Sequence, residues 1–155
     1  MPYAVEVSEA GIWFGREGDV FWAYVHGDFT DEAFAGYLAA LQAAFAPTDR
    51  PSAMFTVAHS PRMPSASHRK ALAELAESEL GPRLQRHAIV SNSAIAQGVV
   101  TALSWLSRKP YEEKIFRTPT DAIAWLQERH PHVGEGLWSD ISARVPASSR
   151  FEGGR

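Results

Sequence analysis

The sequence predicts a single α/β domain with a mixed, mostly parallel sheet, an N-terminal antiparallel hairpin and helices that alternate with the strands. Short runs rich in β-branched and aromatic residues alternate with segments whose apolar residues recur every three or four positions. The chain has 155 residues, which suits one domain. Strand–helix–strand crossovers of this kind place parallel strands side by side, so the alternation itself predicts the sheet.

An antiparallel hairpin is expected near the N-terminus. Residues 12–16 and 20–25 are apolar runs separated by a Glu-Gly-Asp turn at 17–19. Residues 3–7 alternate loosely between apolar and polar side chains, which makes them a candidate edge strand beside the hairpin.

The first crossover begins at Thr30, an N-cap residue followed by two acidic residues that favour the positive end of a helix. Pro47 ends this helix, and residues 52–58 form the next apolar run, which predicts a buried strand. The apolar face of the helix is made by Phe34, Leu38, Leu41 and Phe45.

The same unit then repeats twice. A second helix is capped by Ser65 or Ser67 and ends at a Gly-Pro pair at 81–82, before a strand at 87–90. A third helix precedes a short strand at 114–116. The apolar faces of these two helices comprise Leu72, Leu75, Ala76 and Leu80, and Ile95, Val99, Leu103 and Leu106.

Two helices are expected after the last strand. Thr118 caps the first of them, with Pro119 at the first helical position and Asp121 in the first turn. A short final helix is expected around Leu137–Val145. The domain is predicted to occupy residues 1–146, and residues 147–155 are predicted to be a disordered tail.

Composition excludes several classes of function. The net charge of −3 argues against nucleic-acid binding, because such domains normally carry a basic excess. The absence of Cys excludes disulfides and zinc–thiolate sites. The sequence has no apolar run of about 20 residues and no signal-peptide pattern, so a cytoplasmic protein without a membrane span is expected. Neither glycine-rich nucleotide motif occurs, and no cofactor is expected.

A small ligand is expected at the carboxyl ends of the parallel strands, if one binds at all. Helix N-termini with unpaired N–H groups converge at that edge in open parallel sheets. The competing interpretation, which we favour, is that the hydroxyl groups there only cap helices. The residues that an anion or another small ligand would contact are His26, Asp28, His59, Ser91, Asn92 and Ser93.

A nucleophilic site would pair Ser60 or Ser91 with His26 or His59, oriented by Asp28. The sequence contains no G-x-S-x-G elbow, and no catalytic residue is predicted. An imidazole, a hydroxyl and an acid aligned in one buried cleft would overturn this prediction.

A metal site would use His26, Asp28 and His59, with His130 and His132 as further ligands. The last two flank a proline and have no carboxylate at ligand spacing in the sequence. Surface histidines are therefore the favoured interpretation, and no metal is expected.

A protein-binding surface is predicted around residues 60–69. Basic side chains gather there in an otherwise acidic chain, and a loop that carries Met63 between two prolines is typical of contact sites. A homo-oligomer built on an edge strand or on the last helix is the alternative. If the last helix docks loosely, Leu137 and Trp138 are expected to be interface anchors; otherwise Trp138 is expected in the core. The predicted contact residues are Ser60, Arg62, Met63, Ser65, His68 and Arg69.

The closing segment Glu113–Leu126 leads from a short strand ending in Phe through a Thr-Pro cap into an Ala/Trp/Leu helix. This segment and the order of the elements over about residues 10–130 resemble the STAS-like domains of bacteria, relatives of the anti-sigma-factor antagonists. The resemblance implies a non-catalytic regulatory or scaffolding module that binds another protein. Many such domains are switched by phosphorylation of an Asp-Ser-Ser-Gly motif. Here the sequence reads His59-Ser60-Pro61, so the resemblance does not extend to that switch.

Overall fold

The computed structural model describes residues 6–7, 11–26, 29–46, 51–59, 65–77, 84–91, 93–94, 97–98, 101–102 and 111–145. Within these residues, six strands form one sheet whose spatial order follows the sequence. The first three strands pair antiparallel and the others pair parallel, as the sequence predicted. The strands are β1 (Glu6–Val7), β2 (Ile12–Glu17), β3 (Val20–His26), β4 (Ala53–His59), β5 (Arg86–Val90) and β6 (Glu112–Phe116).

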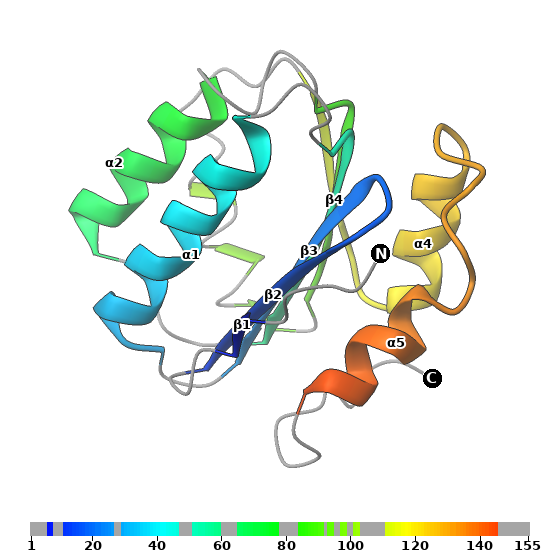
Figure 1. Cartoon of the computed structure of the whole chain (residues 1–155), viewed down its shortest axis with the longest axis horizontal. Coiled ribbons are helices and arrows are strands. Elements are labelled where there is room, and N and C mark those ends of the chain that lie inside the picture. The colour runs from blue at the N-terminus through cyan, green and yellow to red at the C-terminus, as the bar shows by residue number, and fades with distance from the viewer. Residues whose placement is uncertain are drawn as a thin grey trace.

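The labelled helices cover both faces of the sheet (Figure 1). Helices α1 (Asp31–Phe45) and α2 (Ala66–Leu75) lie on one face, and α4 (Pro119–Gln127) and α5 (Leu137–Arg144) lie on the other. Right-handed crossovers that advance in one direction across a sheet place their helices on the same face, which explains the position of α1 and α2. No helix of the described residues is long and apolar enough to cross a membrane.

Alternation along the strands produces two hydrophobic cores. In β3, Trp22 and Tyr24 are buried beneath α4 and α5, whereas Phe21 and Ala23 are buried beneath α1 and α2. The ring of Trp138 in α5 stacks on Tyr24, with the ring centroids 6.1 Å apart. Leu137 is 4% exposed. The last helix therefore packs against the sheet, so the condition under which Leu137 and Trp138 would be interface anchors, a loosely docked helix, is not met.

Three predicted helix caps are confirmed. The side chains of Thr30, Ser65 and Thr118 each accept a hydrogen bond from the backbone N–H three residues ahead. These bonds satisfy N–H groups that the first turn of a helix leaves without partners. Of the two caps proposed for the second helix, Ser65 is the one used.

The hairpin also follows the prediction, with Gly18 in its turn at a φ of 55°. Gly11, at a φ of 92°, lies just before β2, where a Cβ atom would collide with the backbone carbonyl oxygen of His26. The backbone N–H of His26 donates to the Gly11 carbonyl oxygen at 2.8 Å. Glycine at position 11 therefore lets the start of β2 approach the end of β3 closely.

Two strands begin earlier than the sequence predicted. β5 starts at Arg86 and β6 starts at Glu112, because these charged residues pair across the sheet instead of ending the strands. The predicted third helix is described only at residues 94, 97–98 and 101–102, which are helical. The rest of that helix, residues 3–5 and the predicted tail at 147–155 lie outside the described residues.

Candidate functional site

The carboxyl ends of β3 and β4 bring together two of the histidines predicted for a ligand site. His26 and His59 are register partners, and their ring centroids are 4.9 Å apart with the planes at 75°. Burial and the neighbouring His59 lower the pKa of His26, so His26 is uncharged at neutral pH. An uncharged imidazole gives an anion little attraction. Asp28, the predicted acidic member of this group, lies outside the described residues.

Ser91 and Ser93 serve the local backbone. Ser91 is 0% exposed, and its Oγ accepts a hydrogen bond from the backbone N–H of Ser93 at 3.2 Å. The backbone carbonyl of Ser93 accepts from the N–H of Gln97 at the start of the following helix. These contacts support the capping interpretation over a nucleophilic Ser91. Asn92 and Ser60 lie outside the described residues.

The described part of the predicted protein-binding surface is the beginning of α2. Ser65 caps the helix, and His68 packs against Phe34 of α1 with the ring centroids 5.2 Å apart. Arg69 is half-buried, whereas Lys70 is exposed. Arg62 and Met63 lie outside the described residues.

A buried polar chain that the sequence did not predict lies on the α1/α2 side of the sheet. The Oγ1 of Thr56 and the Nε2 of His87 are 2.8 Å apart, and the Nδ1 of His87 is 2.9 Å from a carboxylate oxygen of Glu113. The side chains of His87 and Glu113 are 12% and 14% exposed. Tyr37 of α1 is hydrogen-bonded to Thr56, and burial raises the pKa of Tyr37. This polar chain of side chains therefore joins the strands β4, β5 and β6 to helix α1.

The polar chain of Thr56, His87 and Glu113 contains a hydroxyl, an imidazole and an acid, the three groups whose alignment would overturn a non-catalytic interpretation. Two features argue against catalysis. The Thr56 hydroxyl is shared between His87 and Tyr37. Residues 53–57 of β4, which include Thr56, also pair with both β3 and β5, so their backbone N–H groups are engaged in the sheet. Acyl transfer needs free donors around the developing oxyanion, and a central strand does not supply them.

The opposite edge of the sheet, at the amino ends of the parallel strands, holds a buried arginine. The Nη1 of Arg86 donates to the backbone carbonyl oxygen of Trp125 at 2.6 Å, and the guanidinium carbon lies 4.4 Å from the centre of the Trp125 ring. Arg86 also pairs with Glu128 at 3.2 Å and with Glu112 at 3.5 Å. A cation at the end of α4 interacts favourably with the helix dipole. Arg86 thus joins β5, β6 and α4.

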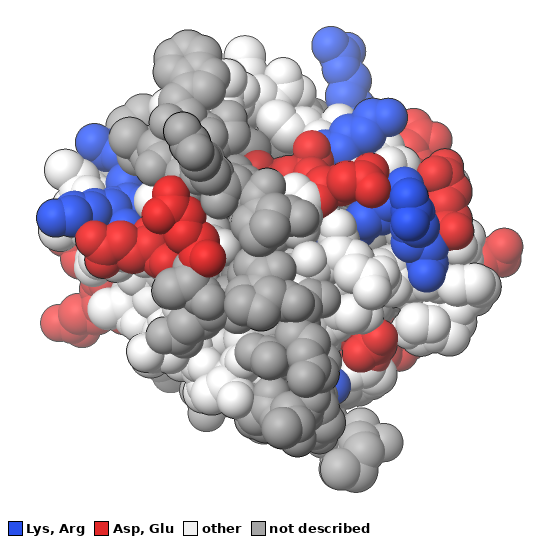
Figure 2. All heavy atoms as spheres, turned by 90° about the horizontal axis from the view of Figure 1, so that it is seen from above, with Lys and Arg blue, Asp and Glu red and all other residues white. Residues whose placement is uncertain are grey.

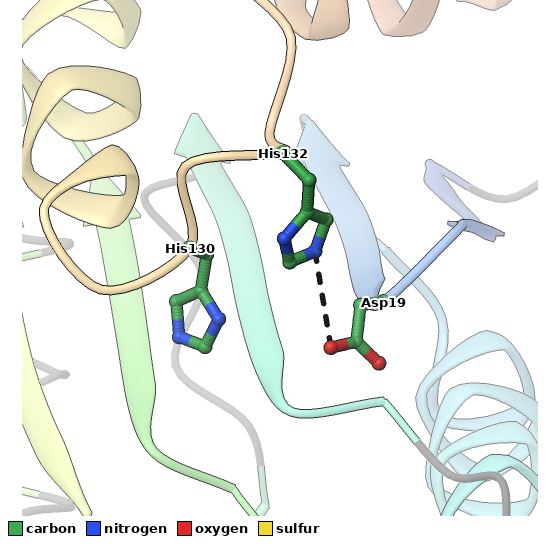
Figure 3. Close-up of side chains that lie close together, drawn as sticks. All are labelled: Asp19, His130 and His132. Atoms are coloured by element: carbon green, nitrogen blue, oxygen red, sulfur yellow. Dashed lines mark ion pairs between the residues drawn. The ribbon is translucent and has the colours of Figure 1, made fainter.

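The same edge holds two histidines and an aspartate that are far apart in the sequence (Figure 3). Asp19 comes from the β2–β3 turn, and His130 and His132 come from the connection between α4 and α5. The Nε2 of His132 is 3.8 Å from the Oδ2 of Asp19, and one potential ligand atom of each residue lies within 4.8 Å of the others. The sequence showed the His-x-His pair but not its carboxylate, because Asp19 reaches the pair only through the fold.

His130 is the buried member of this cluster. It is 4% exposed, and its Nε2 is buried without a hydrogen-bond partner among the described residues. Leaving a buried polar atom unsatisfied costs about 1–3 kcal/mol. Burial and the neighbouring His132 lower the pKa of His130, while Asp19 acts in the opposite direction. The ring is therefore uncharged at neutral pH.

The sequence profile of the SpoIIAA-like family matches residues 20–127, which is more than half of the chain. The chain belongs to the SpoIIAA-like family. The match covers β3 to α4, and so includes the polar chain at His87 and the predicted surface on α2. It confirms the resemblance to STAS-like domains that the closing strand–helix unit suggested.

A solved structure agrees with this assignment. The SpoIIAA-like chain is similar to a protein of the DUF3478 family from Shewanella loihica PV-4, whose crystal structure at 2.25 Å resolution has a SpoIIAA-like fold. The TM-score is 0.56 at 21% sequence identity, and the match covers 79% of this chain and 99% of that one. At this identity the likeness shows the fold alone. No curated protein matches the sequence.

The face of this SpoIIAA-like domain that Figure 2 shows carries mixed charge among the described residues. Seen from above, Lys and Arg side chains lie next to Asp and Glu side chains in two groups (Figure 2). Lys70 and Glu74 form an ion pair at 4.0 Å, and Arg129 and Glu112 form one at 3.8 Å. Mixed charge of this kind does not provide the continuous basic stripe that a nucleic-acid backbone requires.

Proposed function

We propose that this SpoIIAA-like domain is a non-catalytic regulatory module that binds a partner protein through the beginning of α2. SpoIIAA-like domains generally bind proteins, and the fold is generally non-catalytic. The binding surface consists of the solvent-facing residues of α2 between Ala66 and Glu74, together with Arg62 and Met63, which precede α2 in the sequence. We call it the α2 surface.

The observation that carries this proposal is the small contribution of α2 to the core. Only Ala73 and Leu75 of its ten residues are buried, and both lie in its second half. In α1, by contrast, buried residues extend from Ala33 to Phe45. The exposed side chains of α2, those of Ala66, Ser67, Lys70 and Glu74, therefore face solvent, where another molecule can contact them.

The charge of the α2 surface favours an acidic partner. α1 and α4 have acidic residues in their first turn, whereas α2 has none. Arg69 and Lys70 follow instead, so the positive end of the helix dipole is not offset by carboxylates of its own. A protein that presents Asp or Glu side chains would complement this surface.

In the first experiment, a photo-crosslinking amino acid replaces Lys70 in the protein expressed in its host cells. A second variant with the same amino acid in place of Glu135 is the matched control. Lys70 and Glu135 are both exposed, but they belong to different sides of the molecule. We expect a crosslinked protein from position 70 alone. With that protein purified, Lys70→Glu should weaken binding by about tenfold, because a charge reversal opposes an acidic partner.

Lys114→Glu is the matched charge reversal at the β6 edge, where Lys114 is also exposed. It should leave the affinity unchanged. Equal weakening by Lys70→Glu and Lys114→Glu would mean that net charge and not the α2 surface governs binding. Full affinity of Lys70→Glu would reject the surface.

The second candidate function is a hydrolase, and the observation that favours it is the hydroxyl–imidazole–carboxylate chain of Thr56, His87 and Glu113. In a hydrolase, His87 would take the Thr56 proton as the hydroxyl attacks an ester carbonyl. Hydrolysis of p-nitrophenyl acetate tests it with Thr56→Val, and with His26→Gln as the control for general imidazole catalysis. Equal rates for the wild type and Thr56→Val support the non-catalytic proposal, whereas a loss confined to Thr56→Val favours the hydrolase.

A further inference from the structure

We propose that Asp19, His130 and His132 bind a divalent transition-metal ion such as Zn²⁺, with the ion joining the β2–β3 turn to the connection between α4 and α5. The three side chains already converge, since one nitrogen or oxygen atom of each lies within 4.8 Å of the others. Ligand atoms around a tetrahedral zinc ion are roughly 3.3 Å apart. Small side-chain rotations are therefore sufficient to close the site.

His130 is the buried member of the cluster, and its ring lies beside His132 and Asp19 (Figure 3). A buried imidazole normally makes a hydrogen bond, and the Nε2 of His130 has none among the described residues. The ring is held on a short connection whose ends are fixed by α4 and α5, so His130 cannot turn out to water without moving that connection. In Figure 3 the Nδ1 of His130 lies on the side of Asp19 and His132, and Nε2 lies on the far side of the ring, so Nδ1 is the ligand atom that His130 would offer.

Asp19 is already oriented for this role. Its carboxylate accepts a hydrogen bond from the Ser52 hydroxyl, and its backbone carbonyl accepts from the Ser52 N–H at 3.0 Å. Hydrogen bonds of this kind to a ligating carboxylate fix its direction and strengthen metal binding. Figure 3 shows the carboxylate of Asp19 facing the ring of His132, and the Oδ2 of Asp19 lies 3.8 Å from the Nε2 of His132.

The surroundings permit a cation. Arg86 and Arg129 lie nearby, but Glu112 and Glu128 pair with them, so their charge is offset locally. The side chains of His132 and Asp19 are 53% and 40% exposed, which gives an ion access from solvent. A donor set of two imidazoles and one carboxylate suits Zn²⁺, Co²⁺ or Ni²⁺ better than Ca²⁺ or Mg²⁺. Three protein ligands leave one coordination position for water or an external group.

The test uses the full chain, freed of metal by a chelator, and Zn²⁺ or Co²⁺ as the probe. Titration calorimetry should give one Zn²⁺ per chain, Co²⁺ should develop the visible absorption of a tetrahedral site, and the ion should raise the unfolding midpoint. His132→Ala should weaken binding at least about tenfold, since even loss of an outer hydrogen bond to a ligand costs that much. Its midpoint without metal should stay near the wild-type value, because His132 is exposed.

Two further variants complete the design. Asp19→Asn should also weaken binding, which shows that the carboxylate takes part. The double variant His26→Gln/His59→Gln removes the other close histidine pair and should bind Zn²⁺ as the wild type does. The inference is overturned if the wild type binds no Zn²⁺, if His132→Ala binds as well as the wild type, or if the double variant abolishes binding.

Discussion

The two edges of the parallel sheet are built in different ways. At the carboxyl ends of the strands, polar side chains serve residues close to them in the sequence, as Ser65 does for His68 and Ser91 does for Ser93. At the amino ends, polar side chains join distant elements. Arg86 of β5 holds the end of α4, and Asp19 lies against His132. The first edge therefore completes local structure, and the second edge fixes tertiary structure.

This difference follows from the strand order. Ligand crevices form at the carboxyl edge where the order of a parallel sheet reverses and neighbouring helices leave on opposite faces. In the described residues the strands follow one another from β1 to β6 without a reversal. The helix N-termini of α1 and α2 therefore do not open a crevice between them. An edge can carry many cap residues without being a binding site.

Removal of the Arg86 side chain should have the largest effect on stability, and it tests whether the amino edge of the sheet fixes tertiary structure. Arg86→Met should lower the free energy of unfolding by about 1.5–3 kcal/mol, the range for loss of hydrogen bonds to a charged group. Urea unfolding followed by Trp fluorescence measures it. Glu128→Gln, which removes an exposed partner of Arg86, should cost less than about 1 kcal/mol. If the two variants cost the same, Arg86 does not hold the amino edge together.

Removal of a helix cap should have a smaller effect. Thr118→Ala and Ser65→Ala should each lower the free energy of unfolding by about 1 kcal/mol, because each leaves a helix N–H without its acceptor. Thr118→Ser keeps the hydroxyl and should retain most of the stability in the same urea experiment. A cost near zero for both alanine variants would contradict the capping role of this edge.

The pH dependence of stability tests the histidine pair at the carboxyl edge. The pKa of His26 is lowered in the folded protein from 6.5, so the unfolded chain takes up the proton more readily. The contribution of His26 is complete above about pH 6.5 and is lost as the pH falls below it. His26→Gln should therefore lose less stability than the wild type between about pH 7 and pH 5. Parallel curves in thermal unfolding would show that His26 is not responsible.

The smallest effect is expected on α2. Lys70 and Glu74 approach to 4.0 Å, and their side chains are 79% and 68% exposed. Lys70→Ala should change the free energy of unfolding by less than about 0.5 kcal/mol, because exposed pairs in helices contribute little. A cost above 1 kcal/mol in urea unfolding would mean that this part of α2 is needed for the fold and is not a free surface.

Much of the fold could be predicted because its signals are local. The hairpin turn, the Thr118-Pro119 cap and the periodic apolar face of α1 depend on residues within a few positions of one another. The order of the strands depends on chain-wide packing, and no short segment encodes it. The first residues of β5 and β6 were predicted too late for the same reason, since Arg86 and Glu112 extend their strands only when they face each other.

The polar clusters were missed because they depend on register. His87 of β5 lies opposite Glu113 of β6. On the other side of β5, His87 pairs with Met54 of β4, and this register places Thr56, two residues after Met54, on the same face of the sheet as His87. In the sequence Thr56 is one polar residue in an apolar run, which is typical of an ordinary buried strand. Asp19 likewise reads as a turn residue. Its position beside His132 depends on how the connection after α4 folds back over the sheet.

Hydrogen exchange of the complex tests the assignment of binding to the α2 surface most directly. The sample is the full chain bound to the protein that was captured by crosslinking at position 70, compared with the chain alone. Binding through the α2 surface predicts slower exchange of backbone amides in residues 65–75 and unchanged exchange at the amino edge, in residues 128–136. Slower exchange at the amino edge with α2 unchanged would contradict it.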